Sequence, residues 1–242
     1  MAATDTGSSW GLSRRRLVTA AAAMVMAPSA SAVAASDKAR PNAITPDEAL
    51  RRLAAGNARY AANKQEQRDF SAGRAARARV QYPIAAILGC ADSRVAPEFA
   101  FDQGPGKLFV VRVAGNVMDE EGLASLEYAV QFLGVPLIMV LGHSGCGAVS
   151  AAIKTVTEHA TLPGHLPGLI NQIKPAVETA QREKPRSLLD AAIVENVRHT
   201  MVQLTGARPL LADFAARSAI KVAGGVYDIA TGKVRMTEIE RT

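Results

Sequence analysis

Four short, almost continuous apolar runs decide what this 242-residue chain can fold into. Strands that are apolar at nearly every position are covered on both faces, as they are in a parallel sheet. Helical patterns lie between the runs, and this alternation favours an open α/β sheet. The four predicted strands are Ile84–Leu88, Lys107–Val113, Leu137–Leu141 and Ile220–Val226.

Helices are predicted before, between and after these strands. Thr45 is a suitable N-cap and Pro46 suits the first helical position, which predicts a helix over Pro41–Asn63 with Leu53 and Ala54 on one apolar face. A basic, alanine-rich segment is expected to form a short helix or an arm. That segment is Ser71–Arg79, and the remaining predicted helices are Glu121–Leu133, Gly147–Val156, Leu166–Ala180 and Ser187–Leu204.

A last strand is predicted beyond the fourth apolar run. Tyr227–Val234 contains the Asp, Thr and Gly residues typical of a hairpin turn, so the chain after it would return antiparallel at the edge of the sheet. The predicted fold class is α/β. It has an open, mostly parallel sheet of four strands plus an antiparallel edge strand, helices on both faces, and an N-terminal helical arm.

Residues 1–35 indicate an export signal. Consecutive arginines in Ser13–Val18 precede an apolar stretch over Thr19–Ala27 that is too short to span a bilayer, and small residues with Ala-x-Ala cleavage motifs follow. The paired arginines after Ser13 match a twin-arginine signal, with an ordinary secretory signal as the alternative. We therefore expect export by the twin-arginine pathway to the periplasm or the cell exterior.

The net charge of +6 gives little support for a nucleic-acid partner. Three arginines and one aspartate fall within residues 1–35, so the chain that follows carries +4. Its basic residues are interspersed with acidic ones and form no basic run with aromatic neighbours. We expect no nucleic-acid partner and no membrane span in the mature protein.

Two polar motifs follow the first and third predicted strands and contain the only two cysteines of the chain. They are Cys90–Arg94 (Cys-Ala-Asp-Ser-Arg) and His143–Gly147 (His-Ser-Gly-Cys-Gly). Both lie at the carboxyl ends of strands, where open α/β sheets hold their ligands. Two sulfurs, one imidazole and a nearby carboxylate suit a zinc site with room for a reactive water. The pattern predicts a metal-activated hydration or hydrolysis.

A disulfide between Cys90 and Cys146 is the alternative for an exported protein. Zinc is favoured because each cysteine lies in a polar junction with another potential metal ligand close by in the sequence. Cys146 also begins a predicted helix, and the N–H groups at a helix N-terminus stabilise a thiolate. Twin-arginine export carries folded proteins, so the metal could bind in the reducing cytoplasm.

The two motifs resemble those of the β-class carbonic anhydrases. The similarity extends through Phe109–Arg112 and Ser125–Val130 and covers roughly residues 46–238, essentially the whole mature domain. The resemblance implies an enzyme that reversibly hydrates carbon dioxide to bicarbonate and a proton, with one Zn²⁺ per chain as its cofactor. It also implies a homodimer or a larger homo-oligomer.

The resemblance assigns a role to each polar residue of the motifs. Cys90, His143 and Cys146 would hold zinc and leave a fourth position for water. Asp92 would accept a hydrogen bond from the zinc-bound water or hydroxide and direct it at carbon dioxide. Arg94 would hold Asp92 in place through a charge-assisted pair.

In some members the equivalent aspartate moves onto the metal in a closed state, so Asp92 is also a candidate metal ligand. Those members tend to carry a tryptophan three residues before the first cysteine, and this chain has Ile87 at that position. We therefore expect the open state, in which the aspartate stays off the metal.

Four further residues match substrate-pocket positions of the family. Gln81 corresponds to a glutamine that can hydrogen-bond bicarbonate, and Gly147 lies beside Cys146, where backbone must approach closely. Phe109 and Tyr128 correspond to aromatic walls of the pocket that often come from the neighbouring subunit. For both aromatic residues, plain core packing is the alternative.

One stretch departs from the family pattern. Many members have Arg-Asn-x-Ala-Asn where this chain has Arg-Val-Ala-Gly-Asn over Arg112–Asn116. We expect this change to affect the shape of the pocket more than the metal.

The chain is thus expected to comprise a cleaved twin-arginine signal over residues 1–35, an N-terminal helical arm over 36–80, and a zinc-binding α/β catalytic domain over 81–242. Besides a carbonic anhydrase, two functions are considered. One is a hydrolase of carbonyl sulfide or carbon disulfide on the same scaffold, and the other is a non-catalytic zinc- or bicarbonate-binding protein. The pair of Asp92 and Arg94 argues against the second, because a purely structural zinc site needs no orienting pair.

Overall fold

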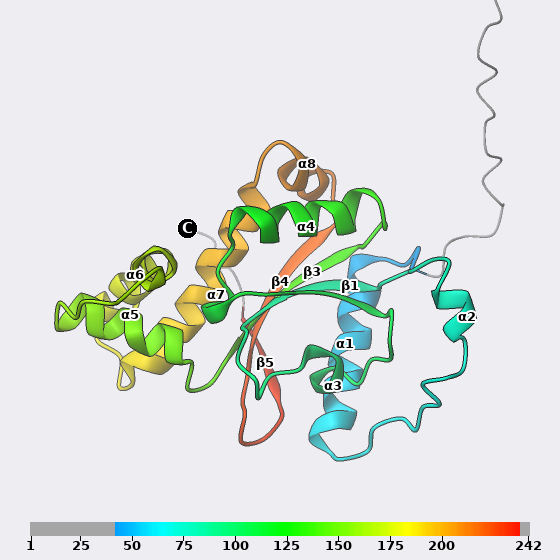
Figure 1. Cartoon of the computed structure of the whole chain (residues 1–242), viewed down its shortest axis with the longest axis horizontal. Helices are drawn as coiled ribbons and strands as arrows, with labels where there is room; N and C mark the ends of the chain where they lie inside the picture. Colours follow the sequence, from blue (N-terminus) through cyan, green and yellow to red (C-terminus); the bar gives the residue numbers. More distant parts are fainter. Residues whose placement is uncertain (1–41, 238–242) are drawn as a thin grey trace, which may run out of the picture. The chain divides into compact units, whose positions relative to one another are not determined.

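The computed structural model describes residues 42–237. Five strands form one sheet in the order β2-β1-β3-β4-β5 (Figure 1). The first four run parallel to one another and the last runs antiparallel to β4, which confirms the predicted fold class. The strands are β1 (Ala85–Gly89), β2 (Leu108–Arg112), β3 (Leu137–His143), β4 (Lys221–Tyr227) and β5 (Val234–Thr237).

Eight helices and one 3-10 turn accompany the sheet in the described part of the chain. Six helices fall within predicted segments, although several boundaries shift by a turn or less and the first begins later than predicted. The sequence did not predict α3, α8 or the turn η1. The elements are α1 (Pro46–Ala61), α2 (Arg74–Arg77), α3 (Pro97–Ala100), η1 (Ala114–Asn116), α4 (Glu120–Gln131), α5 (Gly147–Thr157), α6 (Leu166–Arg182), α7 (Leu188–Gly206) and α8 (Leu210–Ala216).

Helices cover both faces of the sheet, as predicted. Successive strand residues point to opposite faces, so Leu88 packs with the side chains of α4 to α8, whereas Ile87 packs with those of α1 and α3. Every residue of β1 and β3 is buried, which explains why these two strands carry the clearest apolar runs. The edge strand β2 has core contacts on both faces, through Phe109 and Val111 on one and Leu108 and Val110 on the other, but it is only partly buried, so the predicted coverage is incomplete.

Helix α1 begins as its sequence predicts, because the Oγ1 of Thr45 accepts a hydrogen bond from the N–H of Glu48 at 3.1 Å. Its buried face includes Leu53 and Gly56, but Ala54, predicted for the same face, is exposed. A Cβ on Gly56 would lie 1.8 Å from the carbonyl oxygen of Phe101, so the helix crosses the end of α3 at backbone distance. This close packing sets which side of α1 faces the sheet.

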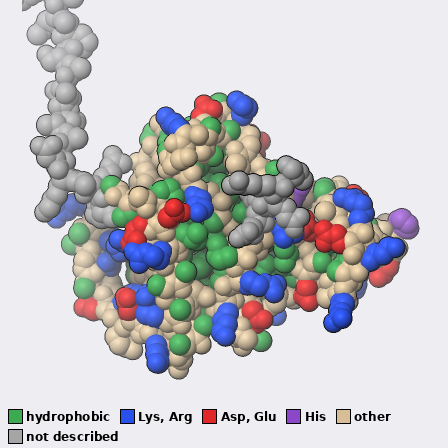
Figure 2. Space-filling model, turned by 180° about the vertical axis from the view of Figure 1, so that it is seen from behind, with side chains coloured by type: hydrophobic (Ala, Val, Ile, Leu, Met, Phe, Trp, Pro, Cys, Tyr) green, Lys and Arg blue, Asp and Glu red, His purple; other side chains and the backbone are tan. Residues whose placement is uncertain are grey.

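The predicted export signal over residues 1–35 lies outside the described residues. Within residues 42–237, no helix combines the length and the hydropathy that crossing a bilayer would require. On the face shown in Figure 2, Lys and Arg side chains are interspersed with Asp and Glu rather than gathered in a stripe.

Candidate metal centre

The carboxyl ends of β1 and β3 bring three potential metal ligands together. Cys90 follows β1, His143 ends β3, and Cys146 immediately precedes α5. The two sulfurs and one ring nitrogen all lie within 4.8 Å of one another, and all three residues are buried. Ligands around one tetrahedral zinc, bound at about 2.0–2.3 Å, lie roughly 3.5–3.8 Å apart. The group is therefore compact enough to close on one ion.

The imidazole of His143 is oriented for metal binding. Its Nδ1 lies 3.0 Å from the carbonyl oxygen of Ser144, which can only accept, so Nδ1 carries the proton. The other nitrogen, Nε2, is then unprotonated, and it is buried without a hydrogen-bond partner. An unpaired buried lone pair is costly, and a metal ion would satisfy it.

The two cysteines are free thiols, so the disulfide alternative is not observed. A hydrogen bond from the thiol of Cys146 lowers the pKa of Cys90 to about 4. The resulting thiolate and burial both raise the pKa of Cys146. Two neighbouring thiolates repel each other, and a divalent cation between them removes that conflict. The donor set therefore fits zinc.

The turn η1 includes part of the stretch that departs from the family pattern, and it contacts the candidate metal centre through a backbone N–H. The N–H of Gly115 donates a hydrogen bond to Sγ of Cys90 at 3.2 Å. Gly115 adopts φ = 73°, and a Cβ there would lie 2.6 Å from Cδ1 of Ile173. Both the left-handed backbone and the close packing favour glycine at this position.

Asp92 and Arg94 form the predicted pair beside the ligands. Arg94 donates from Nε to Oδ1 at 2.9 Å and from Nη2 to Oδ2 at 2.7 Å. These bonds hold the pKa of Asp92 well below its usual range. Oδ2 of Asp92 also lies 3.8 Å from Nε2 of His143, so the carboxylate adjoins the side of the site that the metal would occupy.

Arg112, at the end of β2, is a positioning residue that the motifs did not reveal. Its Nε donates to the carbonyl of Cys90 at 2.9 Å and its Nη2 to the carbonyl of Asp92 at 2.6 Å. The guanidinium thus fixes the backbone of the motif from the neighbouring strand. The register that places Arg112 opposite Gly89 depends on strand pairing, which the sequence alone does not specify.

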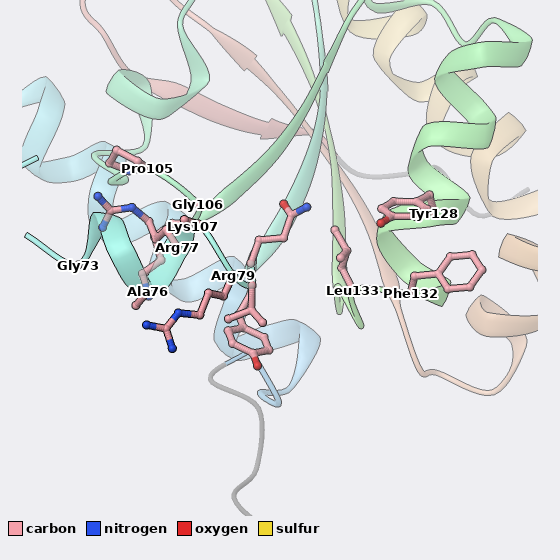
Figure 3. A pocket seen from close by; sticks show the side chains of 14 residues that line it. Gly73, Ala76, Arg77, Arg79, Pro105, Gly106, Lys107, Tyr128, Phe132 and Leu133 are labelled. Carbon is pink, nitrogen blue, oxygen red and sulfur yellow. The ribbon is translucent and has the colours of Figure 1, made fainter. Parts of the chain in front are cut away.

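The other candidate pocket residues are not brought to the metal centre within one chain. Gln81 and Tyr128 line a separate groove of about 1060 Å³ between the α2 segment and α4 (Figure 3). Phe109 stacks on Tyr128 with ring centroids 6.4 Å apart. Gln81 precedes β1 while Cys90 follows it, and the strand alone spans about 13 Å.

Gly147 begins α5 next to the candidate ligand Cys146. Apart from its sequence neighbours and the backbone of its own helix, no atom of residues 42–237 would lie within 4 Å of a Cβ at that position. The expected close approach of backbone therefore has no counterpart among the described residues.

The fold and the site together define an α/β protein with a candidate metal site of two sulfurs and one imidazole, and with an arginine-held carboxylate beside it. A family model described as carbonic anhydrase matches residues 85–234. Carbonic anhydrase 2 of Mycobacterium tuberculosis is 39% identical over 190 residues, which cover 78% of this chain and 91% of that protein.

Two solved structures share the fold. A tetrameric β-carbonic anhydrase from Sordaria macrospora superposes with a TM-score of 0.62 at 25% identity, covering 68% of this chain and 85% of that one. The Coccomyxa β-carbonic anhydrase in complex with acetazolamide gives 0.60 at 27% identity, covering 78% and 82%. This chain belongs to the β-class of the carbonic anhydrase family. It is accordingly an enzyme with zinc as its cofactor.

Proposed function

We propose that this protein catalyses the reversible hydration of carbon dioxide to bicarbonate and a proton, with Cys90, His143 and Cys146 holding the zinc. The position of Asp92 carries the proposal. Its carboxylate lies 3.8 Å from the free nitrogen of His143, and Arg94 holds both of its oxygens. A purely structural zinc site would not need an oriented carboxylate at this point.

Each residue around the metal has a distinct task in this reaction. Zinc bound by the three ligands would supply Lewis acidity, which makes water a nucleophile near neutral pH. Asp92, kept ionised by Arg94, is an acceptor only, so it takes a hydrogen bond from the attacking water and leaves a lone pair directed at carbon dioxide. Both carboxylate oxygens accept from Arg94, which supports the open state rather than the closed one.

The direct test is stopped-flow carbon dioxide hydration by residues 36–242, with zinc counted on the same sample. We expect one zinc per chain and fast hydration, and we expect His143→Asn to lose both. His165→Asn is the matched control, because His165 is exposed. A full zinc load without hydration would contradict the proposal. Turnover of carbonyl sulfide or carbon disulfide would then favour the hydrolase, and no turnover would favour a binding protein.

We also propose that the protein works as a homodimer or a larger homo-oligomer. Tyr128 and Phe132 on the groove are exposed by 48% and 65%, unusually high values for aromatic residues. Gln81 lines the same groove, away from the metal centre of its own chain. A second copy would cover the aromatic residues and could bring Gln81 and Gly147 to a shared site. The tetrameric relative supports this arrangement, as does the family's use of aromatic residues from a neighbouring subunit.

Finally, we propose export by the twin-arginine pathway. The support is the sequence around Arg14 and Arg15, which lies outside the described residues. Replacing both residues with lysine keeps the positive charge that an ordinary secretory signal needs, but removes the paired arginines. We expect the lysine variant to stay unprocessed in the cytoplasm while the natural sequence is exported and cleaved. Unchanged export of the lysine variant would point to the ordinary secretory route.

A further inference from the structure

We propose that Asn196 of α7 is a positioning residue of the metal centre, which holds the Gly115 turn so that its N–H bonds the sulfur of Cys90. The inference rests on the proposed function in one respect, that Cys90 is a metal ligand. Asn196 belongs to neither sequence motif and lies about fifty residues beyond the second one.

Two hydrogen bonds connect Asn196 to the sulfur. Nδ2 of Asn196 donates to the carbonyl of Gly115 at 2.6 Å, and the N–H of Gly115 donates to Sγ of Cys90 at 3.2 Å. The carbonyl and the N–H belong to the same residue, so anchoring the first restrains the direction of the second. Glycine at φ = 73° has no side chain that could supply this restraint.

Helix α7 lies close enough to act on the turn because the last residue but one of β3 is a glycine. A Cβ on Gly142 would lie 2.6 Å from Cγ2 of Val197, the neighbour of Asn196. On the other side, Ile173 of α6 fills the space that a side chain on Gly115 would occupy. The turn is therefore enclosed between two helices, and Asn196 reaches it from the nearer side.

Asn196 is a buried polar side chain, which is unfavourable for the stability of the fold, and this supports a positioning role for it in the site. The residue is 1% exposed, and its Oδ1 has no hydrogen-bond partner. Its neighbours on the buried face of α7 include Ile193, Val197 and Met201, so an apolar residue would suit the packing. A half-satisfied buried amide destabilises a fold, and the Gly115 carbonyl is the group that its Nδ2 satisfies.

Loss of this support should change the sulfur itself. An N–H donor withdraws electron density from a thiolate and fixes its position, and partners of this kind typically change metal affinity by about 10- to 100-fold. Without a held turn, the Cys90 sulfur would donate more strongly to a bound metal but be less well placed. Cobalt(II) in place of zinc reports this change, because sulfur-to-cobalt charge-transfer absorption moves to lower energy as the sulfur becomes a stronger donor.

The experiment compares Asn196→Ala and Asn196→Leu with Thr200→Val in the full mature chain. Asn196→Leu keeps about the size of the side chain but loses the hydrogen-bond donor. Thr200 is the matched control, since it is equally buried one turn later and contacts the Asn116 carbonyl at 3.4 Å rather than Gly115. We expect both Asn196 variants to show the low-energy shift and about tenfold weaker zinc binding, and Thr200→Val to show neither.

Unchanged cobalt spectra and zinc affinities in both Asn196 variants would overturn the proposal while leaving the proposed function intact. An equal shift in Thr200→Val would also overturn it, because the effect would then be general loosening of α7. If the unaltered protein shows no sulfur-to-cobalt absorption, Cys90 and Cys146 are not metal ligands. Both the proposed ligand set and this proposal would then be wrong. If Asn196→Ala does not fold, the result of Asn196→Leu alone decides the proposal.

Discussion

Arg94 holds Asp92 by both carboxylate oxygens, with Nε at 2.9 Å from Oδ1 and Nη2 at 2.7 Å from Oδ2. The N–H of Arg94 adds a third bond to Oδ1 at 3.0 Å. The two residues lie two positions apart on a tight turn, and their side chains form a bidentate ion pair. This pair leaves the carboxylate little freedom to rotate. Arg94 therefore fixes the orientation of the Asp92 carboxylate and does not act through its charge alone.

The first prediction follows from this geometry. Replacing Arg94 with alanine should lower kcat/KM for carbon dioxide hydration by about 10- to 100-fold, because Asp92 then samples unproductive orientations. Zinc content should stay at one per chain, since Arg94 touches no ligand atom. Arg52→Ala is a matched control, as Arg52 also pairs with a carboxylate, that of Glu48 on α1. Equal activity of the Arg94 variant and the control would refute the orienting role.

The second prediction concerns the aromatic groove. Phe132→Glu should reduce the oligomer to a smaller species, because a carboxylate cannot be buried against an apolar partner without a large desolvation cost. Light scattering during size-exclusion chromatography measures the change. Phe99→Glu is the control, because Phe99 on α3 is 68% exposed but lies outside the groove. If both variants keep the native mass, or both lose it, the groove is not the specific interface.

An interaction of the site could be predicted from the sequence when it depends on the type of side chain, but not when it depends on a backbone group. The metal ligands were predictable because Cys90 and His143 follow apolar runs whose strands are buried on both faces. The hydrogen bond from Gly115 was not, because any residue type carries an N–H and only the turn aims it at the sulfur. Asn196 was equally hidden, since its partner is a carbonyl 81 positions away in the sequence.

The same distinction bears on the error in α1 and on the pocket residues that one chain does not bring to the metal centre. Helical periodicity placed Ala54 with Leu53, but the crossing of Gly56 over α3 sets the buried side of α1, and periodicity does not report that contact. Gln81 was expected in the pocket by resemblance, and one chain places it in the groove instead. A residue that reaches its site only in an assembly cannot be located from one chain.

The third prediction concerns removal of the metal. A chelator should lower the melting temperature, because an ion that binds only the folded state adds stability of about 4 kcal/mol at a thousand times its dissociation constant. It should also make Cys90 and Cys146 reactive toward a thiol reagent, whereas the loaded protein should react slowly. Readdition of zinc restores both properties. A melting temperature that chelation leaves unchanged would mean that the three ligands hold no metal in the folded protein.

The last prediction concerns Asp102, a buried carboxylate just after α3 that belongs to neither metal motif. Nε of Arg59 lies 2.6 Å from its Oδ2, and Arg68 donates to its Oδ1 and its carbonyl. These contacts fasten the segment after α1 to the end of α3. Burial alone would raise the pKa of Asp102, but the two arginines outweigh it and the pKa is lowered.

Replacing Asp102 with asparagine keeps the shape and suits its φ of 47°, so the change isolates the charge. We expect a loss of roughly 1–3 kcal/mol in the free energy of unfolding at pH 7, typical of hydrogen bonds to a charged group. Because the pKa of Asp102 is lower in the folded state, its stabilising contribution is fully present above the unfolded-state pKa of about 3.9. That contribution is lost as the pH falls through the folded-state pKa. The difference from the unaltered protein should therefore shrink below about pH 4.

Urea unfolding at pH 7 and at pH 3, each measured against the unaltered protein at the same pH, tests this sign. Asp47→Asn is the control, because Asp47 pairs with Lys221 at 2.7 Å but its side chain is 81% exposed. Its effect should stay within about 1 kcal/mol, since exposed ion pairs contribute little. If Asp102→Asn costs no more than this control, or costs the same at both pH values, the buried charge is not what fastens the segment. A large loss confined to neutral pH would show that the ionised carboxylate holds both arginines in place.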